Sequence, residues 1–421
     1  MMRRFISLLT VLTFAVAAFG ELGDTLSPSP DHPAIGYFTE PAKDPVAELN
    51  RKLVQGTVHL RFEGVQGYLR SVLDALHVPI ESQVAVFSKT SFQAALIHPG
   101  NPRTIFFNDS VAVGWMRGGL VELAAHDPRQ GVIFYVLEQR PVEQPLFRRQ
   151  DGCVSCHVSD PSLGVPGMMV RSTFTQSDGM PRLLLGASVT DHRSPLGDRW
   201  GGWYVTGRSG SARHLGNAFV TDMDHPETMV TPATLNLPSL RGKFDTEAYL
   251  SPYSDIAALM VFNHQTHMTN LLTRVGWEVR LASAEHRDHN ILLREMAKEL
   301  VDYLLFVDEA PLPAKIQGTS GFTEKFGSLG PHDSQGRSLR QLDLNRRLMR
   351  YPCSYMIYTE AFDRLPAEAR QAIYQRMGWI LSGQEKDPKY ARLSLSDRQA
   401  IVGILRETKT DFASYVEPVT R

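Results

Sequence analysis

The sequence predicts an α+β fold that is predominantly α-helical, with a mixed α/β N-terminal part, a glycine-rich middle part and a helical C-terminal part. Three observations predict this fold. Short runs of β-branched and aromatic residues occur before residue 145, glycine and proline interrupt the chain between 151 and 250, and apolar residues recur at helical spacing after residue 255. A chain of 421 residues can bury a large core and predicts two or three domains.

The N-terminal part alternates between helix and strand patterns. Residues 21–50 are rich in proline and predict an extended lead-in, whereas residues 63–77 carry apolar side chains on one helical face. Apolar runs at 84–87, 103–113 and 131–139 predict three strands.

The remaining elements follow from similar patterns. Residues 182–189 and 200–205 are candidate strands within the glycine-rich part. Helices are expected at 255–281, which is apolar on more than one side and therefore central, and at 285–306. A glycine-rich loop is expected at 318–336. A further helix should begin at Pro366 and end at Gly383, and Ser396 with Gln399 predicts a capping box that opens a last helix to about residue 409.

The first 20 residues predict a secretory signal peptide. Arg3 and Arg4 precede an uncharged apolar run at 5–18, and Ala18 and Gly20 supply small residues before a cut at Glu21. An uncleaved anchor is the alternative, although the run is shorter than the roughly 20 residues that span a bilayer. No membrane span is expected in the mature chain. The 44 basic and 45 acidic residues give no case for nucleic acid or an anionic membrane as a partner.

The most specific pattern is Cys153-Val154-Ser155-Cys156-His157. C-x-x-C-H is the attachment signature of c-type haem. Each thiol can form a thioether to one haem vinyl group, and the adjacent histidine can supply an axial nitrogen to the iron. The sequence therefore predicts one covalent haem c on Cys153 and Cys156, with His157 as the iron ligand, in the glycine-rich middle part.

A C-x-x-C pair also occurs in redox-active dithiols and in structural zinc sites. A thioredoxin-like dithiol should follow a strand in a βαβ pattern, but here polar residues precede the motif and Ser, Pro and Gly follow it. A structural zinc site needs four ligands, and the chain has no second Cys pair.

The cysteine count agrees with haem attachment outside the cytoplasm. The chain has three cysteines, so the motif leaves Cys353 without an intramolecular partner, and a disulfide framework is not expected. Cys353 is expected to be a buried apolar thiol. Because haem c is assembled on exported chains, the expected location is the periplasm.

The second axial ligand decides whether the iron only transfers electrons or also binds small molecules. His264 is the preferred candidate, since it lies in the apolar run of the predicted central helix; His267 shares its face, and His214 is a further candidate. Met168 and Met169 represent a methionine class that also includes Met180, Met223 and Met229. An open or water-filled position is the third alternative.

Other side chains could shape a haem pocket. Arg149, Arg171 and Arg199 could neutralise haem propionates, because guanidinium groups pair well with carboxylates. Trp200 and Trp203 could stack at the haem edge. The alternative for each is a surface ion pair or ordinary core packing.

The motif at residues 153–157 resembles that of the c-type cytochromes. The resemblance implies thioether bonds at Cys153 and Cys156 and iron ligation by His157, and it covers little of the chain. Together with the patterns along the chain, the motif predicts a signal peptide at 1–20, a mixed α/β domain at 21–145, a cytochrome-like haem domain at 146–310 and a helical region at 311–421. Two-haem peroxidases related to the methylamine-utilisation maturation enzyme need a second C-x-x-C-H, which is absent.

These inferences predict a periplasmic monohaem c-type cytochrome that transfers single electrons. Its partners would be redox proteins, which dock weakly over small interfaces, or a small-molecule reductant or oxidant. The main alternative is a haem enzyme, an oxidoreductase of peroxidase-like type, or a gas-binding sensor with an open sixth iron position. A third alternative is a protein in which haem only stabilises the fold.

Overall fold

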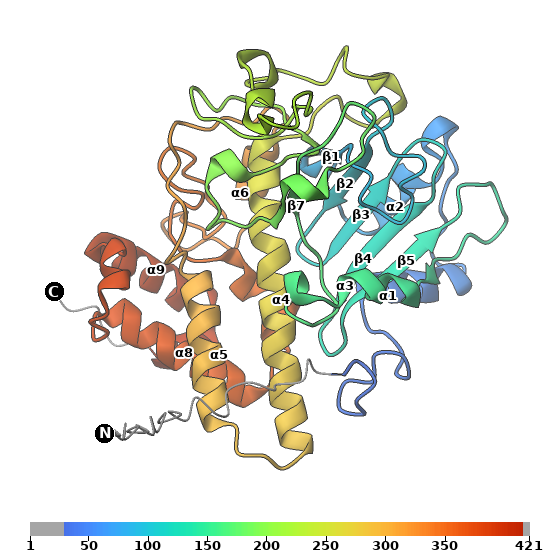
Figure 1. The fold of residues 1–421 in the computed structure, drawn as a ribbon. Helices are drawn as coiled ribbons and strands as arrows, with labels where there is room; N and C mark the ends of the chain where they lie inside the picture. The colour runs from blue at the N-terminus through green and yellow to red at the C-terminus, as the bar shows by residue number, and fades with distance from the viewer. Residues whose placement is uncertain (1–28, 416–421) are drawn as a thin grey trace, which may run out of the picture.

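The computed structural model describes residues 29–415, so the predicted signal segment at 1–20 lies outside the described residues. Within 29–415 the chain forms helices and a seven-stranded antiparallel sheet, which confirms the α+β class (Figure 1). The structure is 39% helical, so the expected predominance of helix is not confirmed.

The strands of the sheet run in the order β6-β5-β4-β3-β2-β1-β9. Their bounds are β1 Val84–Val86, β2 Arg103–Phe107, β3 Val111–Trp115, β4 Val121–Asp127, β5 Gly131–Leu137, β6 Arg148–Arg149 and β9 Trp203–Tyr204. The strands predicted at 84–87 and 131–139 are confirmed.

The single strand predicted at 103–113 is wrong, because the chain turns back within it. The side chain of Asn108 accepts hydrogen bonds from the backbone N–H groups of Ser110 and Val111, each at 3.0 Å, and closes a hairpin between β2 and β3. Strand β4 was not predicted. It contains Glu, Ala, His and Asp, which are depleted or neutral in strands, and pairing with β3 and β5 overrides that preference.

One face of the sheet is covered by α1 (Pro45–Val54) and α2 (Leu69–Ala75). Helix α1 begins inside the predicted lead-in because Asp44 caps it, accepting hydrogen bonds from the N–H groups of Val46 and Ala47. The helix predicted at 63–77 is a 3₁₀ turn followed by α2, since Gly67 adopts a left-handed φ of +59° between them.

The opposite face packs on α4 (Ile256–Ala284), a long helix that lies between the sheet and the C-terminal helices (Figure 1). The rings of Phe107 and Phe262 lie 4.8 Å apart at this contact. Asp255 caps the helix and accepts from the N–H groups of Ala257 and Ala258. The prediction of a central, mostly buried helix is confirmed.

Further helices complete the C-terminal part. They are α5 (Asn290–Leu304), α6 (Phe322–Ser328), α7 (Glu360–Asp363), α8 (Ala367–Ser382) and α9 (Leu395–Thr408). Helix α8 ends at Gly383 as predicted, with φ +84°. The predicted cap of α9 is wrong by two residues: Ser394, not Ser396, accepts from the N–H of Asp397. Helix α6 lies within the segment that was expected to be a loop.

The glycine-rich part is mostly irregular and carries a two-stranded sheet of β7 (Arg171–Thr173) and β8 (Ala187–Val189). Only the last residues of the strand predicted at 182–189 are extended. Strand β9 pairs with β1, so the segments 21–145 and 146–310 share one sheet, and the division into domains stays a prediction. Within the described residues, none of the helices combines the length and apolar character needed to cross a bilayer.

Candidate cofactor site

The C-x-x-C-H motif lies on a short stretch of helical backbone. The 3₁₀ turn Asp151–Cys153 runs directly into α3 (Val154–His157). Residues three and four apart on a helix share a face, so Cys153, Cys156 and His157 project to the same side. Both thiols are free, with Cys156 exposed and Cys153 half-buried. The spacing therefore places two thiols and one imidazole on the same side of one helical stretch.

The His157 ring is fixed by a hydrogen bond. Its Nδ1 lies 2.8 Å from the carbonyl oxygen of Gly167, and a carbonyl can only accept, so Nδ1 must carry the proton. Nε2 then holds a lone pair, and no hydrogen-bond partner for it occurs within residues 29–415. Burial lowers the pKa of His157, which favours the neutral ring. A neutral imidazole with one nitrogen anchored and the other free is the form that binds iron.

The sheet forms one wall beside the motif. The ring of Phe134 on β5 lies 4.6 Å from that of His157. On the same face Arg103 of β2 reaches across β3 to Glu122 of β4, with 2.6 Å between Nη2 and Oε2. Gly114 on β3 leaves room for this reach, since a Cβ there would lie 2.7 Å from the guanidinium and push it aside.

Three charged side chains act on His157. After burial, the largest cause of its lowered pKa, Arg103 and Arg171 lower the pKa further and Glu122 raises it. Arg171 was predicted from the sequence as a propionate partner, whereas Arg103 and Glu122 were not. Nothing in the local sequence marks them, since only the register of β2, β3 and β4 brings them to the motif.

The other predicted pocket residues make contacts within the protein. Arg149 pairs with Asp151 at 2.6 Å, and the buried Arg199 donates to the backbone carbonyls of His192 and Ser194. Two indole N–H groups are also occupied: that of Trp200 donates to Asn263 Oδ1 at 2.7 Å, and that of Trp203 donates to the Arg171 carbonyl at 2.8 Å. Trp203 is therefore held by the strand that carries Arg171, whereas Trp200 packs on α4.

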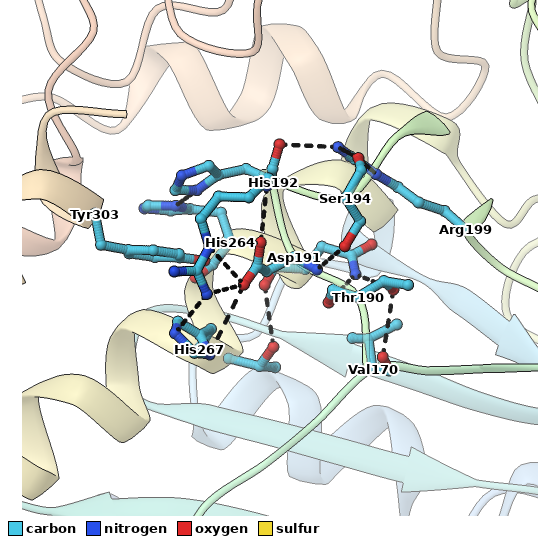
Figure 2. A network of polar contacts seen from close by, with 12 residues as sticks. Val170, Thr190, Asp191, His192, Ser194, Arg199, His264, His267 and Tyr303 are labelled. Carbon is cyan, nitrogen blue, oxygen red and sulfur yellow. Dashed lines mark hydrogen bonds and ion pairs between the residues drawn. The ribbon is translucent and has the colours of Figure 1, made fainter. Parts of the chain in front are cut away.

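His264 lies in a buried polar network (Figure 2). Its Nδ1 is 2.8 Å from Nδ1 of His192, and its Nε2 is 2.7 Å from the hydroxyl of Ser354. The ring also stacks on Tyr303 and Phe306. Iron ligation by His264 would require one of these hydrogen bonds to break. His192 and Ser354 were not identified from the sequence.

The other candidate ligands are also engaged. Nε2 of His267 lies 3.1 Å from the guanidinium of Arg193, which pairs with Asp191 (Figure 2). His214 is the exception: it is buried against Trp200, with ring centroids 5.6 Å apart, and its Nδ1 has no hydrogen-bond partner among the described residues. Met168 and Met169 follow Gly167 directly; Met168 is buried, and the guanidinium of Arg171 lies 3.8 Å from the sulfur of Met169.

Two further findings concern possible metal-binding groups and similarity to known proteins. Within the described residues, no group of three or more His, Cys, Asp or Glu side chains is arranged to hold a metal ion. No protein-family model matches the chain, and neither the curated proteins nor the solved structures compared with it include a match. The account of the site therefore rests on its geometry.

Because several histidines are buried, we expect the free energy of unfolding to fall in mild acid. Burial lowers the pKa of His126, His214 and His267 to about 4 and that of His264 to about 3, below the ordinary value of about 6.5 for the unfolded chain. At pH values between the folded and unfolded pKa of each ring, the unfolded chain binds more protons than the folded chain. The free energy of unfolding therefore falls as pH falls. Each group contributes up to about 1.4 kcal/mol per pH unit. Glu309, whose burial raises its pKa to about 7, acts in the opposite direction.

Urea unfolding at pH 7.5 and pH 5.5 measures this effect, in a range above most carboxyl pKa values. His126→Gln, which removes one titrating group beside Thr273, should make the pH dependence shallower. Equal stability at both pH values would show that these rings are not buried in neutral form.

Proposed function

We propose that the chain is an exported, periplasmic protein that carries one covalent haem c on Cys153 and Cys156 and transfers single electrons. The observation that supports this most is the state of His157, with Nδ1 bonded to Gly167 and Nε2 free. His157 would hold the iron, and Arg103 and Arg171 supply positive charge near it. The haem supplies the one-electron chemistry, while the protein orients its ligand and sets the surrounding charge.

A redox-active dithiol is less well supported by the local geometry. Reactive thiols have lowered pKa values, often at the N-terminus of a helix. Burial raises the pKa of the Cys153 thiol, and α3 spans only Val154–His157. Cys153 thus lies at the N-terminus of only a single helical turn, and its raised pKa disfavours the thiolate that a thioredoxin-like site needs.

A second candidate function is a haem oxidoreductase or gas-binding sensor with an open sixth iron position. The occupied nitrogens of His264 and His267 favour it, because neither ring is free to take that position without a rearrangement. An open position admits oxygen, peroxide or nitric oxide.

One experiment separates the two candidates. The full chain, expressed with a haem c maturation system and purified from the periplasm, should show a haem c optical spectrum when reduced. A spectrum that carbon monoxide leaves unchanged would support two protein ligands and electron transfer. A clear shift with carbon monoxide would support the open-site function, and the lack of a haem spectrum would refute both.

A further inference from the structure

We propose that Asn270 of α4 is a positioning residue that sets the reduction potential of the haem, acting through the loop that anchors His157. The proposal rests on the proposed function. Asn270 does not touch the motif; its link to His157 passes through Met168 and Gly167.

The amide of Asn270 clamps the backbone of Met168 from both sides. Its Oδ1 accepts from the N–H of Met168 at 3.1 Å, and its Nδ2 donates to the carbonyl of Met168 at 2.8 Å. Asn270 is 1% exposed, so water does not compete for these bonds. The preceding residue, Gly167, carries the carbonyl that accepts from His157.

The fit between helix and loop is tight. A Cβ on Gly167 would lie 2.1 Å from Oδ1 of Asn270, so the residue before Met168 must be glycine for the clamp to close. The N–H of Gly167 also donates to the carbonyl of His157 at 3.0 Å. Helix α4 thus fixes the place of the Gly167 carbonyl, and with it the hydrogen bond to Nδ1.

This hydrogen bond has an electronic effect on a bound iron. Donation from Nδ1 makes the imidazole a stronger electron donor at Nε2 and favours the oxidised metal. Loosening the carbonyl should therefore raise the reduction potential. We expect the ratio of reduced to oxidised protein at a fixed potential to rise about tenfold, which for a one-electron couple is about 59 mV.

The chain offers a matched control on the same helix. Asn263 lies two turns before Asn270 and is also fully buried, and its side chain also holds backbone from the glycine-rich part. It donates to the carbonyl of Thr190 at 2.6 Å and accepts from the indole N–H of Trp200. Within the described residues Asn263 makes no hydrogen bond to Gly167 or Met168. Asn263→Ala should therefore weaken the fold but leave the clamp on Met168, and with it the potential, unchanged.

A second pair of variants tests the loop from its other side. Gly167→Ala should displace the clamp and raise the potential as Asn270→Ala does. Gly152→Ala is its control, because a Cβ on Gly152, next to Cys153, meets no atom within 4 Å. These variants keep the test usable where Asn270→Ala does not fold.

The experiment is a redox titration of the haem-loaded full chain, followed by its optical spectrum. A raised potential in Asn270→Ala and Gly167→Ala, with Asn263→Ala and Gly152→Ala unchanged, is the expected result. Equal potentials in all four haem-loaded variants would overturn the role of Asn270 and leave the proposed function standing. A wild-type chain without covalent haem would instead refute the proposed function itself.

Discussion

Replacing Cys153 and Cys156 together by serine should abolish covalent haem attachment completely. A serine hydroxyl cannot form the thioether bond, and both sulfurs lie on the face that His157 shares. Both chains are expressed with the maturation system, purified and denatured. The double variant should then retain no haem, whereas the wild type should retain it in full.

Cys353→Ala is the matched control for this loss. The Cys353 thiol is fully buried in the core, where burial raises its pKa and its role is packing. Covalent haem content should be unchanged in this variant. Haem that remains bound to the Cys153→Ser/Cys156→Ser chain after denaturation would contradict the assignment of the motif.

Asp255→Ala should lower the free energy of unfolding by about 4–5 kcal/mol. One carboxylate oxygen accepts from the N–H groups of Ala257 and Ala258 at the start of α4, and the other accepts from the N–H groups of Thr319 and Ser320. Loss of a helix cap costs about 1–2 kcal/mol, and each buried donor left unpaired costs about 1–3 kcal/mol more. Asp255 is fully buried, so water cannot take over the hydrogen bonds that its carboxylate accepts.

Asp44→Ala provides the comparison, since Asp44 caps α1 with two backbone bonds and one from the Tyr135 hydroxyl. Its loss should cost about half as much. Urea denaturation of both variants, with the far-ultraviolet signal as readout, measures the difference. If Asp255→Ala were no more destabilised than Asp44→Ala, the carboxylate would not join α4 to the 319–320 turn.

The residues of the site that could be predicted from the sequence are those that lie close together along the chain. Cys153, Cys156 and His157 lie within one helical stretch, so their shared face follows from the spacing alone. Helix α4 was also predictable, because its apolar residues cover more than one side and Asp255 suits the cap.

The parts that were missed depend on contacts between distant segments. Arg103 meets Glu122 only through strand register and the absence of a side chain on Gly114. Asn270 and Met168 are hydrogen-bonded although they are 102 residues apart in the sequence, and His264 and His192 although they are 72 residues apart. His264 was predicted as an iron ligand because a buried polar ring needs a partner, and its protein partners could not be known from the sequence.

Whether the chain carries a covalent haem is measured by the intact mass of the full chain after export with a haem c maturation system. The expected chain is heavier by one haem, with the added mass located by digestion on the peptide that contains Cys153 and Cys156. A chain without the added mass, or with a disulfide between these two cysteines, would contradict covalent attachment of haem.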